Sequence, residues 1–200
     1  MENLKGYEYN KYSIKLNDYL KTVQDSKVNL ELCAKLREKA NKLRKETSIK
    51  LFNYINSSKK VDLKKVDKLY KMGADLNFKF NNDITLYMLA GIKAKPEVLD
   101  YLKLRNVDIF AKTNLGQDAL MLTSFVTNNK NVQIALNVTS SENIKTVRLL
   151  REHGLGMKLE YDLMGLSQND YYMGATDPFT NTIEDKFIVP LIIKENTLTI

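Results

Sequence analysis

The sequence VDKLYKMGADLN at residues 66–77 returns in altered form as VLDYLKLRNVDIF at residues 98–110, and this repetition determines the expected fold. Gly73 and Asn106 are 33 residues apart, and so are Asp75 and Asp108. A constant period with matching residue types indicates stacked supersecondary units, each of which buries its apolar face against a neighbour.

These passages resemble ankyrin repeats, in which an outer helix ends in Gly-Ala-Asp, a turn-rich finger follows, and Gly-x-Thr-Pro-Leu-His-x-Ala opens an inner helix. The first part of that pattern is GAD at residues 73–75, and the second is TLYMLA at residues 85–90, without the Pro and the His. Later copies are GQDALML at residues 116–122 and IKTVRLLREHG at residues 144–154.

The resemblance covers roughly residues 48–167 and implies a mainly α fold, an ankyrin-type solenoid of about three divergent repeats. The repeats would occupy residues 47–167, between a basic amphipathic helical cap at residues 1–46 and a C-terminal cap at residues 168–200. Gly116 and Gly165 are 49 residues apart, which indicates an insertion. It falls at residues 127–143 and is expected to extend an inner helix and then to loop out.

Helical spacing extends to both sides of the two passages. Residues 12–45 carry apolar side chains at steps of three and four, which predicts one or two amphipathic helices that cover the open end of the first repeat. A basic surface for nucleic acid or an acidic membrane is the first alternative for these helices, and a dimerising coiled coil is the second. Further outer helices are predicted at residues 63–72 and from Pro96, the latter with a buried stripe of Val98, Leu99 and Leu102.

The C-terminal residues follow other patterns. Residues 170–175 are consistent with a short last helix. The β-prone runs at residues 187–193 and 197–200 predict a terminal hairpin or strand. The hairpin would cover the end of the repeats, or would add its edge to a partner's sheet.

Composition and charge limit the possible function classes. Residues 1–60 contain 14 Lys and Arg against 7 Asp and Glu, whereas the rest of the chain is balanced, so the net charge of +7 belongs to the N-terminal part. Cys33 is the single cysteine, which excludes an internal disulfide and predicts a reducing compartment. Neither end has the apolar run of a signal peptide or a membrane span, so we expect a cytoplasmic protein.

The sequence shows little catalytic chemistry. His153 is the single histidine and precedes Gly154 at the end of a predicted helix, where a cation is favourable. Cys33 lies on the apolar stripe of the N-terminal helix, as a small core residue would. Zinc, calcium and phosphate-binding motifs are missing from the sequence, so we expect a protein that is not an enzyme and uses no metal or cofactor.

The resemblance implies a binding surface made of the fingers and inner helices. Alignment with the family places partner-binding residues at the finger tips, where two aromatic side chains replace small or polar ones in the first finger. They are Phe78, Lys79, Phe80 and Asn81 in the first finger, Lys112, Thr113 and Asn114 in the second, and Tyr161, next to Glu160, in the third. We expect both phenylalanines to be exposed anchors; the alternative is that one folds back onto the next finger.

Two functions remain open at this point. The first is a protein–protein interaction module, an adaptor or an inhibitor by occupancy, that binds another protein on the concave face. The second is association with nucleic acid or an acidic surface through the Lys-rich N-terminal helices. Binding that falls steeply with ionic strength would favour the second.

Overall fold

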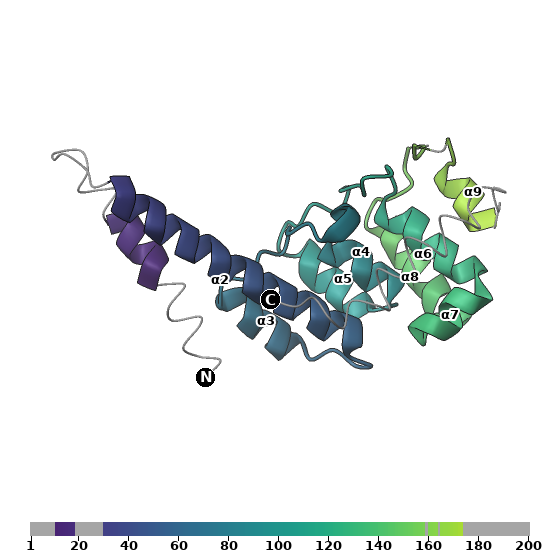
Figure 1. The fold of residues 1–200 in the computed structure, drawn as a ribbon. Coiled ribbons are helices and arrows are strands. Elements are labelled where there is room, and N and C mark those ends of the chain that lie inside the picture. Colours follow the sequence, from purple (N-terminus) through teal and green to yellow (C-terminus); the bar gives the residue numbers. More distant parts are fainter. Residues whose placement is uncertain (1–10, 19–29, 159, 164, 174–200) are drawn as a thin grey trace. The chain divides into compact units, whose positions relative to one another are not determined.

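The computed structural model describes residues 11–18, 30–158, 160–163 and 165–173 (Figure 1). This part of the chain is mainly helical, as predicted, and it contains no β-strand beyond one isolated bridge between Tyr161 and Ser167. The predicted hairpin at residues 187–200 lies outside the described residues. After a helix at residues 11–18, the elements are α2 (Leu30–Ser57), α3 (Leu63–Lys71), the 3-10 helix η2 (Asn81–Asp83), α4 (Leu86–Ile92), α5 (Pro96–Lys103), α6 (Ala119–Asn128), α7 (Lys130–Leu136), α8 (Ser140–Glu152) and α9 (Gln168–Met173).

The chain divides into two compact units. The first unit contains Met1–Tyr54 and Asp62–Phe78, and the second contains Ile55–Val61 and Lys79–Ile200. Within the described residues, no helix is both long enough and apolar enough to cross a membrane.

In the first unit, α2 and α3 are joined through the turn that follows α3. The backbone N–H of Asp75 donates to Ser48 Oγ at 2.8 Å, and Arg44 forms an ion pair with the Asp75 carboxylate at 2.9 Å. Both partners lie on α2, which is continuous from Leu30 to Ser57. The predicted boundary between residues 46 and 47 therefore falls inside one helix, because the sequence there has no Gly or Pro to end it.

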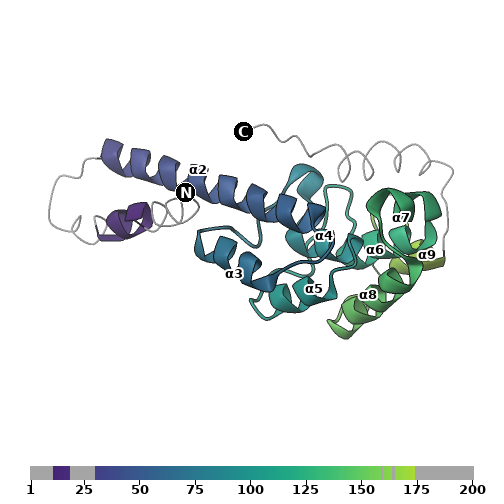
Figure 2. The same cartoon turned by 90° about the horizontal axis from the view of Figure 1, so that it is seen from below.

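The second unit is built around α4 and α6. α4 packs against α5, α6 and α8, and α6 packs against α7, α8 and α9; the central helices lie side by side in both views (Figures 1 and 2). Every residue of α4 is buried, and so is every residue of α6 from Ala119 to Val126. Helices covered on several sides need apolar residues all round, which explains the runs LYMLAGI and ALMLTSFV.

The helix α5 forms as its sequence predicts. Pro96 occupies its first turn, where a missing N–H costs no hydrogen bond. The predicted stripe of Val98, Leu99 and Leu102 is fully buried, with 0% of each residue exposed. The α3 prediction is confirmed in the same way, since α3 spans Leu63–Lys71 and buries Val66 and Leu69.

The insertion at residues 127–143 begins as predicted, because α6 continues to Asn128, but the predicted loop that should follow is wrong. Residues 130–136 form a separate helix, α7, and α8 begins at Ser140. The side chain of Asn129 caps α7 by accepting the N–H of Val132 at 3.1 Å, and Asn137 ends it in a left-handed conformation with φ 54°. Asn is favoured at both positions, because its short amide can cap a helix and tolerates positive φ.

Candidate binding site at three turns

Three five-residue turns in the second unit share one backbone hydrogen bond. In each of them, the N–H of the first residue donates to the carbonyl of the fifth at 2.9 Å. We call them the first turn (residues 80–84), the second turn (residues 113–117) and the third turn (residues 162–166). The bonds run from Phe80 to Ile84, from Thr113 to Gln117 and from Asp162 to Leu166.

Two further positions of the turns also correspond. The fourth residue has positive φ in every case: 61° at Asp83, 82° at Gly116 and 76° at Gly165. The residue after each turn supplies a side-chain oxygen to a backbone N–H three residues later, at the start of the next helix. These residues are Thr85 before α4, Asp118 before α6 and Ser167 before Asp170 of α9. The second turn lies 33 residues after the first, and the third lies 49 residues after the second.

Single backbone hydrogen bonds connect consecutive turns. Asn114 N donates to Asn82 O at 3.1 Å, and Leu163 N donates to Leu115 O at 2.9 Å. The carboxylate of Glu160 also pairs with the Lys112 ammonium at 2.7 Å. Hydrogen bonds therefore join the first turn to the second and the second turn to the third.

The first position of each turn is buried whatever residue occupies it. The exposed fraction is 8% for Phe80, 8% for Thr113 and 7% for Asp162. The expectation that Phe80 is an exposed anchor is therefore wrong, and Thr113 is not available to a partner either. The equivalence of Phe80 with Thr113, 33 residues later, was the sequence signal that both occupy the same inward position.

The other predicted tip residues lie at the surface to different degrees. Lys79, Asn81 and Asn114 are exposed, Lys112 is half-buried in its ion pair with Glu160, and Tyr161 is 56% exposed. Phe78 is half-buried and belongs to the first unit. Asn114 thus lies in the second turn, Lys112 precedes it, and Tyr161 precedes the third turn.

A cavity of about 440 Å³ adjoins the second and third turns. Its rim carries two large exposed apolar side chains, Phe110 at 60% and Met157 at 84%. The lining residues are Phe110, Asp118, Glu160, Gln168 and residues 154–158. Phe110 and Met157 were not among the predicted site residues. Phe110 ends the second matching passage at the position where the first has Asn77, and that difference was the available signal.

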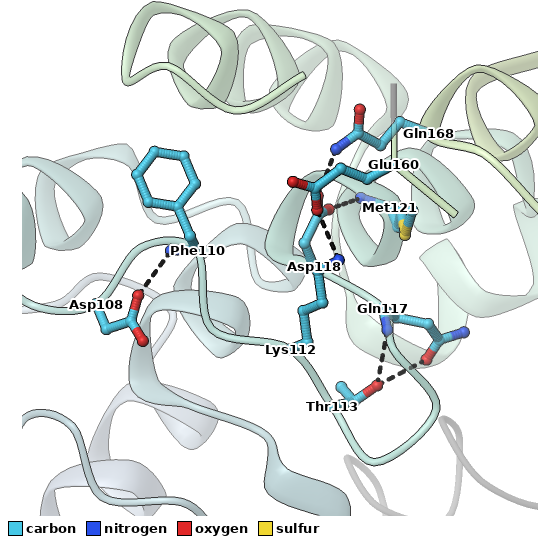
Figure 3. Close-up of polar contacts among 9 residues, drawn as sticks. All are labelled: Asp108, Phe110, Lys112, Thr113, Gln117, Asp118, Met121, Glu160 and Gln168. Carbon is cyan, nitrogen blue, oxygen red and sulfur yellow. Dashed lines mark hydrogen bonds and ion pairs between the residues drawn. The ribbon is translucent and has the colours of Figure 1, made fainter. Parts of the chain in front are cut away.

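A buried carboxylate lines this cavity. Asp118 is 4% exposed. Its Oδ1 accepts the N–H of Met121 at 2.7 Å, and its Oδ2 accepts a hydrogen bond from Gln168 Nε2 at 2.6 Å. Figure 3 shows Gln168 joined to this carboxylate, Glu160 paired with Lys112, and the Phe110 ring to one side. The cavity therefore combines an apolar rim with an acidic group inside.

Buried hydrogen bonds hold the third turn against the second. Gln117 Nε2 donates to Tyr171 Oη at 2.8 Å, and that hydroxyl donates to Asp162 Oδ2 at 2.6 Å. The network uses polar groups of two turns and of α9. It fixes the wall of the cavity without filling it.

His153 joins three helices. It is the C-cap of α8, as its position before Gly154 predicted, and 5% of its side chain is exposed. Its Nδ1 is 2.7 Å from Tyr87 Oη on α4, and its Nε2 is 2.9 Å from Asp100 Oδ1 on α5. Burial, and to a lesser degree the Asp100 carboxylate, raises the pKa of the Tyr87 hydroxyl above its usual range. These contacts connect α8 to α4 and α5, which is a structural role for His153.

A second cavity, of about 260 Å³, contains Lys59, Lys93 and Lys95. Burial, and then the neighbouring Lys95 ammonium, lower the pKa of Lys93 to about 8. The helices α2, α4 and α7 all end at this cavity, and helix C-termini present unpaired carbonyls that favour cations. Lys95 Nζ donates to the carbonyl of Lys59 at 2.6 Å. Lys95 thus has a helix-end carbonyl as its partner, whereas burial and Lys95 make the charged form of Lys93 less favourable.

No model of a known protein family matches the chain, and a search of curated proteins finds no significantly similar sequence. Among the residues that the structure describes, no three His, Cys, Asp or Glu side chains are grouped to hold a metal ion. The function is therefore argued from the geometry of the turns and the cavity.

Proposed function

We propose that this chain is a non-enzymatic protein-binding module built on ankyrin-type repeats, which holds another protein on the surface formed by its turns. The recurrence of one hydrogen-bond pattern at three turns supports the repeat assignment. Helix ends support it as well, since the N–H groups of Ala74, Val107 and Leu155 each donate to a carbonyl five residues earlier.

Exposed apolar side chains in and beside the second and third turns carry the proposal. Phe110 and Met157, which line the cavity, are 60% and 84% exposed, and Tyr161 and Leu163 at the third turn are 56% and 73% exposed. Exposed apolar patches on monomers mark interaction sites. Aromatic residues and Met are also enriched in protein–protein interfaces.

The rigidity of the turns favours binding through this surface. Each turn is closed by its own backbone hydrogen bond, and each is bonded to the next. A surface that is already ordered loses little conformational entropy when a partner binds, so more of the contact energy appears as affinity.

An alternative site is supported by α2. Between residues 34 and 45, this helix exposes six basic side chains and one acidic side chain, that of Glu38. The basic residues are Lys35, Arg37, Lys39, Lys42, Arg44 and Lys45. A surface of this kind fits nucleic acid or an acidic membrane, and its binding would weaken steeply as salt increases.

Affinity capture with matched variants tests the proposal. We expect the parent chain to retain a defined protein partner from a lysate of its source, and the double variant Phe110→Ala with Met157→Ala to lose it. The control variant Ile134→Ala with Ile144→Ala also removes exposed apolar side chains, 70% and 39% exposed, but from α7 and α8. It should retain the partner.

Salt separates the two functions in the same assay. Capture that persists in high salt and depends on Phe110 and Met157 supports the protein-binding module. If the Phe110/Met157 variant captures as much as the parent, and capture disappears in high salt, the turn surface is not the site and the basic face of α2 replaces it. Phe80→Ala is not a suitable variant here, because that side chain is buried.

A further inference from the structure

We propose that the cavity beside the second and third turns takes an arginine side chain of the partner protein, with its guanidinium on Asp118 and its aliphatic stem along Phe110. This inference rests on the proposed protein-binding function and names the chemistry that the partner must present.

The dimensions of the cavity suit one long side chain. Its volume of about 440 Å³ lies within the range of ligand pockets in proteins. The entrance is apolar, with Phe110 and Met157 exposed, and the carboxylate of Asp118 is the buried ionisable group in the lining. A side chain with an apolar stem and a charged end would place its stem at this apolar entrance and its end at the carboxylate inside.

The hydrogen-bonding capacity of Asp118 is only partly used. A carboxylate has about four acceptor positions, two on each oxygen. Oδ1 accepts one bond, from Met121 N, and Oδ2 accepts one, from Gln168 Nε2. One further acceptor position therefore remains on each oxygen, which is the arrangement that a guanidinium binds with two parallel N–H groups.

The charges around the cavity favour a cation. Glu160 is paired with Lys112 at 2.7 Å, whereas Asp118 forms no ion pair with any residue that the structure describes. Lys158 lines the cavity but is exposed to solvent. Asp118 also lies at the N-terminus of α6, where the helix dipole favours negative charge. A guanidinium that enters the cavity would therefore give the Asp118 carboxylate a partner of opposite charge.

The carboxylate of Asp118 favours arginine over lysine. A planar guanidinium can present two parallel N–H groups to the two oxygens, whereas an ammonium is a point charge. A guanidinium is also less strongly hydrated than an ammonium, so it loses less on entering a cavity.

Titration of the full chain with small amides, followed by NMR, tests the inference. The probes are Nα-acetyl-arginine amide, its neutral isostere Nα-acetyl-citrulline amide, and Nα-acetyl-lysine amide. We expect arginine amide to shift the signals of Asp118, Gln168 and Met157, and to bind about ten times more tightly than citrulline amide. Equal affinity of the arginine and citrulline amides, or shifts that lie elsewhere, would overturn the inference. Equal affinity of the lysine amide would overturn the choice of arginine.

Two variants make the test specific. Asp118→Asn keeps the oxygen that caps α6 and removes the charge, with the Gln168 amide turned so that its oxygen accepts from the new Nδ2. It should lower the affinity for arginine amide about tenfold and leave citrulline amide unchanged. Phe110→Leu keeps an apolar rim and removes the ring along which the stem lies, so it should weaken arginine amide and citrulline amide alike, several-fold, while the unfolding midpoint stays the same. An unchanged arginine affinity in both variants contradicts the inference.

The inference and the proposed function fail in different ways. If arginine amide does not bind but partner capture still depends on Phe110 and Met157, the module stands and another side chain occupies the cavity. If capture does not depend on these residues, the proposed function fails whatever arginine amide does.

Discussion

The first and second turns share a closing hydrogen bond and have opposite chemistry. Phe80 and Thr113 start them, each is 8% exposed, and each donates its N–H across the turn at 2.9 Å. Phe80 places a ring in the interior, whereas the Thr113 hydroxyl accepts the N–H groups of Leu115 and Gln117. The comparison shows that the backbone decides which side chain of a turn is buried. The exposed aromatic lies before the second turn, at Phe110.

The largest effect that this comparison predicts is on stability. Phe80→Ala should lower the free energy of unfolding by about 3–5 kcal/mol, because it removes a buried ring and leaves a cavity. Phe110→Ala should change it by no more than about 0.5 kcal/mol, because that ring is largely exposed. Urea unfolding of both variants measures the difference. Equal losses would mean that the two rings do not differ in burial.

The fourth position of the turns gives the next largest effect. Gly116 has φ 82°, and a Cβ there would lie 3.2 Å from Leu163 N and 3.3 Å from Asp162 Cα. Gly116→Ala should therefore cost about 1–3 kcal/mol, from backbone strain and from the close contact with the third turn.

Asp83 is the matched position in the first turn, and it holds φ 61° with a non-glycine residue. Asp83→Gly relieves that strain but adds freedom to the unfolded chain, so the net change should stay within about 0.5 kcal/mol. Thermal unfolding of the two variants compares the positions. A stable Gly116→Ala variant would show that the second and third turns can separate without cost.

The helices were the part of the fold that the sequence could reveal. The residues that end α3 and α5, Gly73 and Asn106, both have positive φ, and the helices begin near the predicted residues. These features are local, since they depend on cap residues, on Pro96 and on the spacing of apolar side chains.

The proposed site could be predicted only in part. The sequence placed partner-binding residues on the turns, but it did not reveal that Phe80 and Thr113 are buried, and it did not single out Phe110, Met157 and Asp118. The direction of a side chain in a turn depends on which N–H closes the turn, and the sequence pattern does not display that bond. The contact between Asp118 and Gln168 joins residues 50 positions apart, which no local pattern indicates.

The helix caps after the turns give a smaller effect. Asp118→Ala removes the cap of α6 and the acceptor of Gln168, and it should lower the free energy of unfolding by about 1–2 kcal/mol. Asp118→Asn keeps an amide oxygen for Met121 N, but Gln168 must turn its amide to accept from the new Nδ2, so the loss should be smaller than for Ala, below about 1 kcal/mol. Chemical denaturation of the two variants is the measurement. If Asn costs as much as Ala, the cap is not what stabilises α6, and the charge or the bond to Gln168 is.

The smallest predicted effect concerns pH at the cap after the third turn. Hydrogen bonds from Ser167 Oγ, and then from Ser167 N, lower the pKa of Asp170 below its ordinary value of 3.8. The unfolded chain therefore binds this proton at a higher pH than the folded chain does. The stabilisation is fully present above pH 3.8, and it is lost as the pH falls through the lower pKa of the folded state.

The first turn should not show this effect, because Met88 stands where the third turn has Asp170. Hydrogen exchange of the Tyr171 amide, followed from pH 6 to pH 2.5 with correction for intrinsic rates, should show protection that falls in acid, whereas the Leu89 amide of α4 should show no such step. Asp170→Asn should remove the step at Tyr171, because the amide carries no titrating proton. If the step persists in that variant, another carboxylate near α9 controls it, and the neighbouring Asp118 and Asp162 become the groups to replace.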